Sequence, residues 1–227
     1  MPNWNELFYD ANNRDQAPER EIFRLIALLE KTFTERPLRL WDLGCGAGRH
    51  TAAIAGSGSL AYASDNAPKA VELTREWLRQ LGLHADVRMA EMTDSPWADD
   101  VSFHGVFSWL VIHHNTLRNI KDTVSLINRK LVPNGLLLAT VVSDKACGVE
   151  KGQEIEPGTF ISEIGDESGV PHHYFTESGI RDLFDTELWE IIILAEQVTR
   201  YIETADRFWT FNPFRYTTWE ILVKKRN

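Results

Sequence analysis

The residues best suited to chemistry in this sequence form one short run, Asp42-Leu43-Gly44-Cys45-Gly46-Ala47-Gly48-Arg49. The apolar residues before it predict a buried strand, and its three glycines predict a tight turn that opens a helix. Glycine suits such a turn because it adopts backbone angles that other residues resist and lets the main chain approach a ligand closely. The run therefore predicts a site for a nucleotide-like ligand.

The glycine spacing separates two classes of ligand, dinucleotides and S-adenosylmethionine. A dinucleotide fingerprint needs its third glycine three positions after the second, and Arg49 occupies that position here. The third glycine is instead Gly48, and Asp42 before the turn suits a ligand with an ammonium group better than a diphosphate. The pattern favours S-adenosylmethionine, with an NAD(P)-dependent oxidoreductase as the alternative.

This acidic and glycine pattern resembles the first motif of the class I S-adenosylmethionine-dependent methyltransferases. The resemblance implies that Asp42 and the turn residues Gly44, Cys45, Gly46 and Gly48 bind the cofactor. It also implies that Asp65, at the end of the second strand, binds both ribose hydroxyls, since one carboxylate can accept both protons. Asn66 would then lie beside the ribose or the adenine.

A second segment that carries the resemblance precedes the pair Pro96-Trp97. In the family an acidic residue a few positions before such a pair contacts adenine. This implies that Glu91 accepts a hydrogen bond from the adenine amino group and that the Met92 backbone meets the ring. Asp94 competes with Glu91 for that role, and a solvated surface carboxylate is the alternative for Glu91.

The third segment, Ser108–His114, is similar to the family's fourth-strand motif. By this resemblance Ser108 and Trp109 contact the cofactor, although Trp109 could equally be a core residue. His113, at the mouth of the strand, and His173, at the end of a long loop, are the candidate catalytic residues on the substrate side, because histidine is the favoured base near neutral pH. Packed or capping histidines are the alternative.

No metal is expected at these histidines. His113-His114 and His172-His173 are two adjacent pairs, and the sequence shows no nearby carboxylate at ligand spacing. Methyl transfer from a sulfonium is an in-line displacement in which positive charge disperses, so alignment and a dry pocket supply much of the acceleration. A general base is needed only if the acceptor must lose a proton.

Alternating apolar patterns predict the fold. The expected helices and strands are a helix before Pro37, strands at 38–43, 60–64, 85–90, 106–112 and 136–142, helices between them, a short helix capped by Thr176, and final strands at 188–195 and 217–223. This order indicates an α/β fold. The resemblance makes it Rossmann-like: a seven-stranded, mostly parallel sheet with an antiparallel last strand and helices on both faces.

The length favours one domain over 1–227, with 1–36 as an N-terminal helical cap and 143–175 as a lid or substrate loop. The connection 196–216 has no assignment. The net charge of -9 disfavours nucleic acid and anionic membranes as partners. Two cysteines, no signal peptide and no membrane-spanning run favour a soluble cytoplasmic protein.

The charge and the absence of an added RNA-binding module favour a small-molecule methyl acceptor. The layout is also similar to the small bacterial tellurite-resistance type methyltransferases. Alternatives are a non-catalytic protein that binds S-adenosylmethionine and a methyltransferase that acts on protein or RNA. The sequence leaves the oligomeric state open.

Overall fold

A seven-stranded sheet forms the centre of the protein. The structure, a computed structural model, describes residues 17–146, 152–163, 167–201 and 214–227. The strand order is β3-β2-β1-β4-β5-β10-β9. The strands are β1 (Arg39–Leu43), β2 (Leu60–Asp65), β3 (Ala85–Met89), β4 (Phe103–Trp109), β5 (Leu131–Val142), β9 (Trp189–Tyr201) and β10 (Phe214–Lys225). Strands β1 to β5 pair in parallel, and β10 runs antiparallel to both of its neighbours. The predicted fold class is confirmed.

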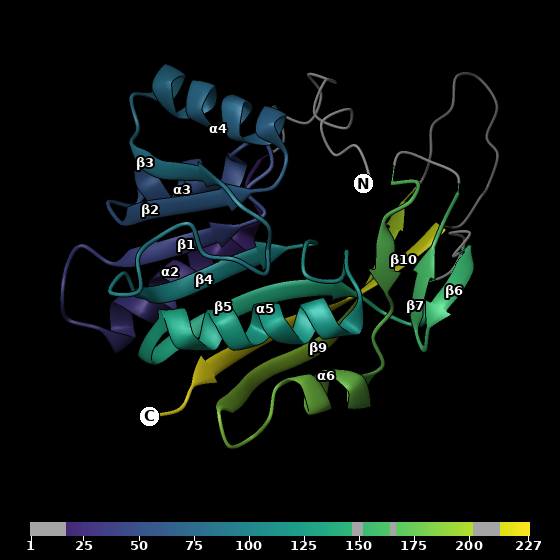
Figure 1. Ribbon diagram of the computed structural model, residues 1–227. Coiled ribbons are helices and arrows are strands. Elements are labelled where there is room, and N and C mark those ends of the chain that lie inside the picture. The colour runs from purple at the N-terminus through teal and green to yellow at the C-terminus, as the bar shows by residue number, and fades with distance from the viewer. Residues whose placement is uncertain (1–16, 147–151, 164–166, 202–213) are drawn as a thin grey trace.

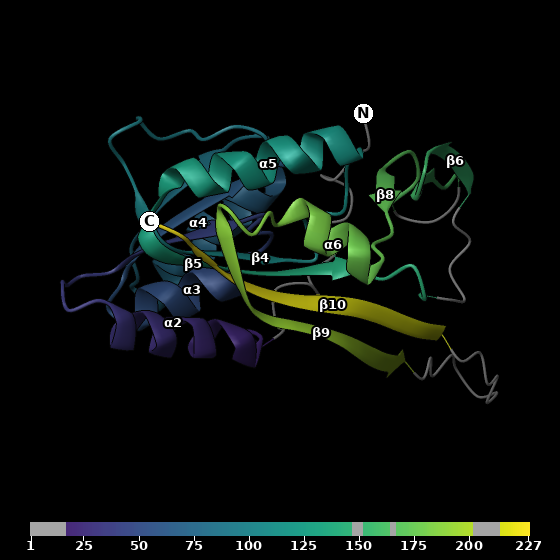
Figure 2. The ribbon, with the colours of Figure 1, turned by 90° about the horizontal axis from the view of Figure 1, so that it is seen from below.

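Helices cover both faces of this sheet. Figure 2 shows α2 (Arg20–Thr32) and α3 (Arg49–Gly56) on one face and α5 (Leu117–Lys130) and α6 (Glu177–Leu183) on the other. Helix α4 (Pro68–Leu81) packs against α3 and β3. Thr176 caps α6 as predicted, because its hydroxyl accepts a hydrogen bond from the Gly179 N–H at 3.0 Å.

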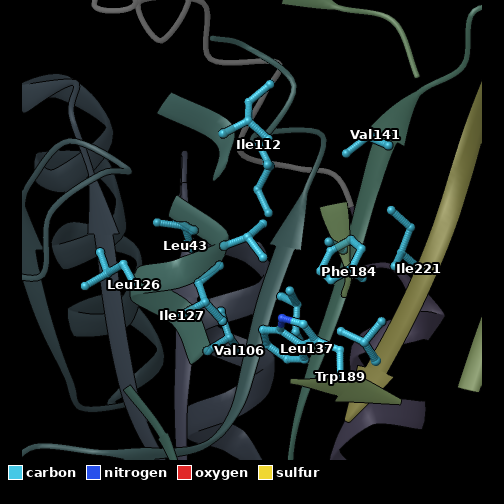
Figure 3. Close-up of a cluster of buried hydrophobic side chains, with 14 of the residues drawn as sticks. Leu43, Val106, Ile112, Leu126, Ile127, Leu137, Val141, Phe184, Trp189 and Ile221 are labelled. Atoms are coloured by element: carbon cyan, nitrogen blue, oxygen red, sulfur yellow. The ribbon is translucent and has the colours of Figure 1, made fainter. Parts of the chain in front are cut away.

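Two buried clusters flank the sheet because successive strand residues point to opposite faces. In β1, Leu40 packs toward α2 and α3, whereas Trp41 and Leu43 pack toward α5 and α6. Figure 3 shows part of the second cluster, in which strand residues meet side chains of α5 and the aromatic pair Phe184 and Trp189. The core thus holds the strand ends, and the first residues of the loops that follow them, in fixed positions.

The boundaries of several strands differ from the sequence prediction. Strand β4 begins at Phe103. It ends at Trp109, because Leu110 takes a positive φ of 57°. Strand β5 begins at Leu131, where a register shift in its pairing with β4 accommodates Pro133-Asn134-Gly135. Strands β9 and β10 extend to Tyr201 and from Phe214, so the unassigned connection shrinks to 202–213, which lies outside the described residues.

The expected lid or substrate loop, 143–175, contains regular structure in its described part. A three-stranded antiparallel sheet is formed by β6 (Gln153–Glu156), β7 (Thr159–Ile161) and β8 (Pro171–His173). It lies beyond the end at which β5 finishes (Figures 1 and 2). The strands are only three or four residues long, too short for a periodic pattern, and Pro157-Gly158 supplies the tight turn between β6 and β7.

The predicted N-terminal helical cap falls partly outside the described residues. Of the N-terminal helical cap at 1–36, residues 1–16 are not described, and α2 lies on the sheet in contact with β4 and β5. No helix among the described residues is both long enough and apolar enough to cross a membrane.

Candidate functional site

The glycine turn joins β1 to α3 with all three glycines at positive φ. Gly44, Gly46 and Gly48 have φ of 75°, 53° and 90°, a region that side chains with a Cβ resist. The N–H groups of Gly44 and Cys45 both donate to the Ser64 carbonyl, at 2.8 and 3.1 Å. The turn is therefore fastened to the end of β2.

The turn also touches the loop after β4. A Cβ placed on Gly44 would lie 2.3 Å from Cγ2 of Val111, so a larger residue would displace that loop. No sequence pattern indicates this contact, because Gly44 and Val111 are far apart along the chain. It brings the first motif and the fourth-strand motif to one edge of the sheet.

Asp65 ties the turn to the end of β2 through its side chain. Its Oδ2 accepts from the Gly46 N–H at 2.9 Å and its Oδ1 accepts from the Ala67 N–H at 2.9 Å. Each carboxylate oxygen has two lone pairs, so both oxygens can accept further hydrogen bonds. Burial raises the pKa of Asp65, while the backbone N–H donors oppose that shift.

Asp42 lies under the turn and is 1% exposed. Its Oδ2 accepts a hydrogen bond from the Thr51 hydroxyl at 2.6 Å. Burial raises the pKa of Asp42 to about 7, and the hydrogen bond from Thr51 opposes that shift. Among the described residues, no ion pair joins Asp42 or Asp65 to a basic side chain.

The residues predicted to surround adenine lie at the next strand ends. The Asn66 side-chain amide donates to Oε2 of Glu91 at 3.1 Å, which brings the ends of β2 and β3 together. Glu91 is exposed, and Met92 is half-buried against the core. Asp94, which competes with Glu91 for the adenine contact, lies three positions after Glu91 and is exposed. Its N–H donates to the Glu91 carbonyl.

Ser108 and Trp109 end β4 on opposite sides of the sheet. Ser108 is fully buried, and its hydroxyl has no hydrogen-bond partner among the described residues. The Trp109 ring stacks on Phe107 at 5.8 Å and lies 6.4 Å from the ring of His50. Trp109 thus packs against the core, as the alternative interpretation expects, while remaining half-exposed.

The two candidate catalytic histidines lie close together, and both are buried. The His173 N–H donates to the His113 carbonyl at 2.8 Å, so β8 is joined to the loop after β4. Nδ1 of His173 shares a hydrogen bond of 2.7 Å with the Thr159 hydroxyl, and its ring packs against Phe175. Burial lowers the pKa of both histidines, that of His113 well below its usual range.

The structure brings three further residues close to His113, namely His114, His172 and Glu167. The rings of His113, His114 and His172 cluster, with His114 and His172 centred 4.6 Å apart. Glu167 contacts His172 at 2.7 Å and His114 at 3.7 Å. The prediction of no metal rested on the lack of a carboxylate near these histidines, and Glu167 removes that reason.

Comparison with known proteins agrees with this geometry. Residues 41–135 match the family model of a methyltransferase domain. A ubiquinone biosynthesis O-methyltransferase from Methylocella silvestris is 28% identical over 124 residues, 53% of this chain and 47% of that protein. The matched stretch thus spans about half of that relative's length.

Solved structures share the fold. An S-adenosylmethionine-dependent methyltransferase from Methanosarcina mazei superposes with a TM-score of 0.67 at 16% identity, covering 93% of this chain and 99% of that one. A 1,6-didemethyltoxoflavin-N1-methyltransferase from Burkholderia thailandensis gives 0.62 at 15% identity, covering 92% and 80%. The sheet order and the glycine turn agree with the methyltransferase family match over residues 41–135 and with the fold of these solved methyltransferases.

The residues at the strand ends fit the cofactor of this family. Two carboxylates, that of the buried Asp42 and that of the half-buried Asp65, have spare lone pairs and no ion pair with a basic side chain among the described residues. An ammonium group and a pair of hydroxyls would satisfy them. When bound, S-adenosylmethionine supplies an electrophilic methyl group, and the chain's task is to orient it and to exclude water.

Proposed function

We propose that this chain is an S-adenosylmethionine-dependent methyltransferase that acts on a small-molecule acceptor by in-line methyl transfer. The observation that carries the proposal is the fastening of the glycine turn to Asp65, through the Gly46 N–H. That bond fixes the ribose-binding candidate relative to the backbone that would hold the methionine part. Asp42 then lies where the ligand's ammonium is expected.

In this proposal the chain acts mainly by positioning the cofactor and the acceptor, and less by acid–base chemistry. Asp65 accepts hydrogen bonds from the ribose hydroxyls. Asn66 and Glu91 border the adenine, and the backbone of the glycine turn approaches the methionine part of the cofactor. His113 and His173 lie on the substrate side, at the junction between the loop after β4 and β8. Their role toward the acceptor stays a prediction.

A small-molecule acceptor is supported by three observations. The net charge of -9 opposes binding to nucleic-acid backbones. The matched relative from Methylocella silvestris is named for ubiquinone biosynthesis, and the Burkholderia thailandensis enzyme was solved with 1,6-didemethyltoxoflavin bound. Both names describe reactions on small organic molecules. A cytoplasmic location belongs to the same proposal, and cell fractionation tests it.

The experiment that tests the proposal incubates the purified chain with tritiated S-adenosylmethionine and fractionated cell extract. Label in small metabolites, together with release of S-adenosylhomocysteine, is the expected result. Label in protein or RNA would replace the small-molecule acceptor by a macromolecule. The Asp65→Asn variant serves as the control for transfer by a contaminating enzyme.

Two other outcomes would point to the remaining alternatives. Tight binding of S-adenosylmethionine with no S-adenosylhomocysteine from any extract would indicate a non-catalytic binding protein. Calorimetry that found NADH bound more tightly than S-adenosylmethionine would favour the oxidoreductase.

A further inference from the structure

A compact group of histidines lies at the junction between the loop after β4 and the three-stranded sheet. His113 and His114 follow β4, His172 lies in β8, and Glu167 lies in the turn before β8. One ring nitrogen from each histidine lies within 4.8 Å of the others. The centroids of the His113 and His114 rings are 4.0 Å apart, and those of His114 and His172 are 4.6 Å apart.

The hydrogen bonds of His172 show that the group needs a cation. Its Nδ1 lies 3.0 Å from the Val170 carbonyl oxygen, which can only accept, so Nδ1 carries a hydrogen and donates it. In the neutral ring Nε2 then has a lone pair, and this nitrogen lies 2.7 Å from Oε2 of Glu167. Two acceptors approach so closely only when a proton joins them, and a metal ion bound to both atoms would take the place of that proton.

The second Glu167 oxygen and His113 favour a metal ion over a proton. Oε1 of Glu167 lies 3.7 Å from Nε2 of His114, so the carboxylate faces two histidines at once. His113 is 1% exposed, and its Nδ1 has no hydrogen-bond partner among the residues described. A proton shared by His172 and Glu167 would leave that buried nitrogen unsatisfied, at a cost of about 1–3 kcal/mol.

We propose that His113, His114, His172 and Glu167 form a binding site for a divalent transition-metal ion of the class that prefers imidazole ligands, such as Zn²⁺ or Co²⁺. Three nitrogens and one carboxylate suit a tetrahedral ion, whereas Mg²⁺ and Ca²⁺ select oxygen ligands. Ligand atoms around tetrahedral zinc lie about 3.4 Å apart. On binding, the histidine nitrogens, which lie within 4.8 Å of one another, close in, and Oε2 of Glu167 moves away from Nε2 of His172, from which it is now 2.7 Å distant. The bond from His172 Nδ1 to the Val170 carbonyl is the outer contact that fixes a metal-bound histidine.

The site lies next to the proposed cofactor site without sharing residues with the glycine turn. The loop that carries His113 also carries Val111, which contacts Gly44. A metal ion here would bind an oxygen or nitrogen atom of the methyl acceptor as a fifth ligand and lower its pKa. That role rests on the proposed function, whereas metal binding itself does not.

The test uses the full chain, stripped with a chelator and titrated with Co²⁺ without any methyl donor. We expect one Co²⁺ per chain, with the intense visible absorption of a tetrahedral site, displacement by Zn²⁺, and no competition from Mg²⁺. His172→Gln and Glu167→Gln should each weaken binding by about 10-fold or more. His84→Gln, at an exposed histidine outside the group, is the control and should bind like the wild type.

Two results would overturn the proposal. If the stripped chain shows no saturable Co²⁺ or Zn²⁺ binding, the cation between His172 and Glu167 is a proton. If His172→Gln and Glu167→Gln bind as tightly as the wild type, the ions sit elsewhere on the surface. Both residues are partly exposed, and circular dichroism and thermal unfolding check that the variants fold. Because no methyl donor is present, failure here leaves the proposed methyl transfer to its own test.

Discussion

The backbone N–H of Gly46 donates a 2.9 Å hydrogen bond to Oδ2 of Asp65. This bond joins the turn after β1 to the end of β2, so the two parts proposed to hold the cofactor cannot move independently. A change at Asp65 should therefore affect both ligand binding and the turn.

The first prediction concerns Asp65→Asn. The amide removes the negative charge and one acceptor atom, and hydrogen bonds to charged groups contribute about 1.5–3 kcal/mol each. We expect the affinity for S-adenosylhomocysteine to fall by about 10-fold or more in isothermal titration calorimetry. Glu72→Gln, the same loss of charge at an exposed position on α4, is the control and should leave affinity unchanged. Equal affinity of Asp65→Asn and wild type would contradict the assigned role.

A second prediction follows from the close approach at Gly44. Gly44→Ala places a Cβ 2.3 Å from Val111 at a φ of 75°. Crowding and backbone strain together should lower the free energy of unfolding by about 2–4 kcal/mol, as measured by urea denaturation. Gly58→Ala is the control, because its φ is 85° but no atom lies within 4 Å of the added Cβ. Its cost should be only about 1–2 kcal/mol.

The double variant separates the two causes at Gly44. Adding Val111→Ala to Gly44→Ala should restore part of the lost stability, because it removes the methyl groups that the new Cβ meets. No recovery would mean that backbone strain accounts for the whole effect.

The third prediction concerns pH. Burial raises the pKa of Asp42 in the folded protein to about 7, from an ordinary value of 3.8. Between these two values the folded state binds more protons than the unfolded chain, so the free energy of unfolding falls as pH rises. The destabilisation is absent below the ordinary pKa and complete above about pH 7. Asp42→Asn keeps an acceptor for Thr51 and should remove this dependence.

Urea denaturation at several pH values between 4 and 8 measures this effect without ligand. The difference in unfolding free energy between Asp42→Asn and wild type should grow in favour of the variant as pH rises, then level off. Asp122→Asn, at an exposed position on α5, should run parallel to wild type. Parallel curves for Asp42→Asn would show that the carboxylate titrates normally.

A fourth prediction tests the contact between His173 and Thr159. Thr159 is fully buried and shares a 2.7 Å hydrogen bond with Nδ1 of His173. Thr159→Val keeps the shape, leaves the buried nitrogen of His173 unpaired and also removes the 2.8 Å hydrogen bond that the hydroxyl donates to Oε1 of Glu156, so the free energy of unfolding should fall by about 1–3 kcal/mol. Thr32→Val, at an exposed threonine, should change stability by less than about 0.5 kcal/mol. A Thr159→Val variant as stable as wild type would remove the structural role of this bond.

The parts of the site that were predictable from sequence are those defined by local patterns. The glycine turn follows from residue spacing, and the position of Asp65 follows from the length of one strand-helix-strand unit. Both are set by the backbone over short stretches. The α/β class was predictable for the same reason, because apolar strands and amphipathic helices alternate along the chain.

The histidine group could not be predicted, because it joins segments that no local pattern connects. Adjacent strand residues face opposite sides, so His172 points into the group while His173 points toward Thr159. The sequence offered the pair without indicating which member faces which side. Glu167 gave no signal, since its proximity depends on the fold of the small sheet.

The ends of the 143–175 segment meet each other. Ser143 and Phe175 form a parallel bridge, and the Asp144 N–H donates to the Phe175 carbonyl at 3.0 Å. The chain therefore leaves the large sheet and returns to it at one point. Because its two ends meet, the 143–175 segment can be shortened, lengthened or exchanged without shifting any strand of the seven-stranded sheet. Under the proposed function, exchanging this segment between relatives would alter which acceptor is admitted and leave the residues proposed to hold the methyl donor in place.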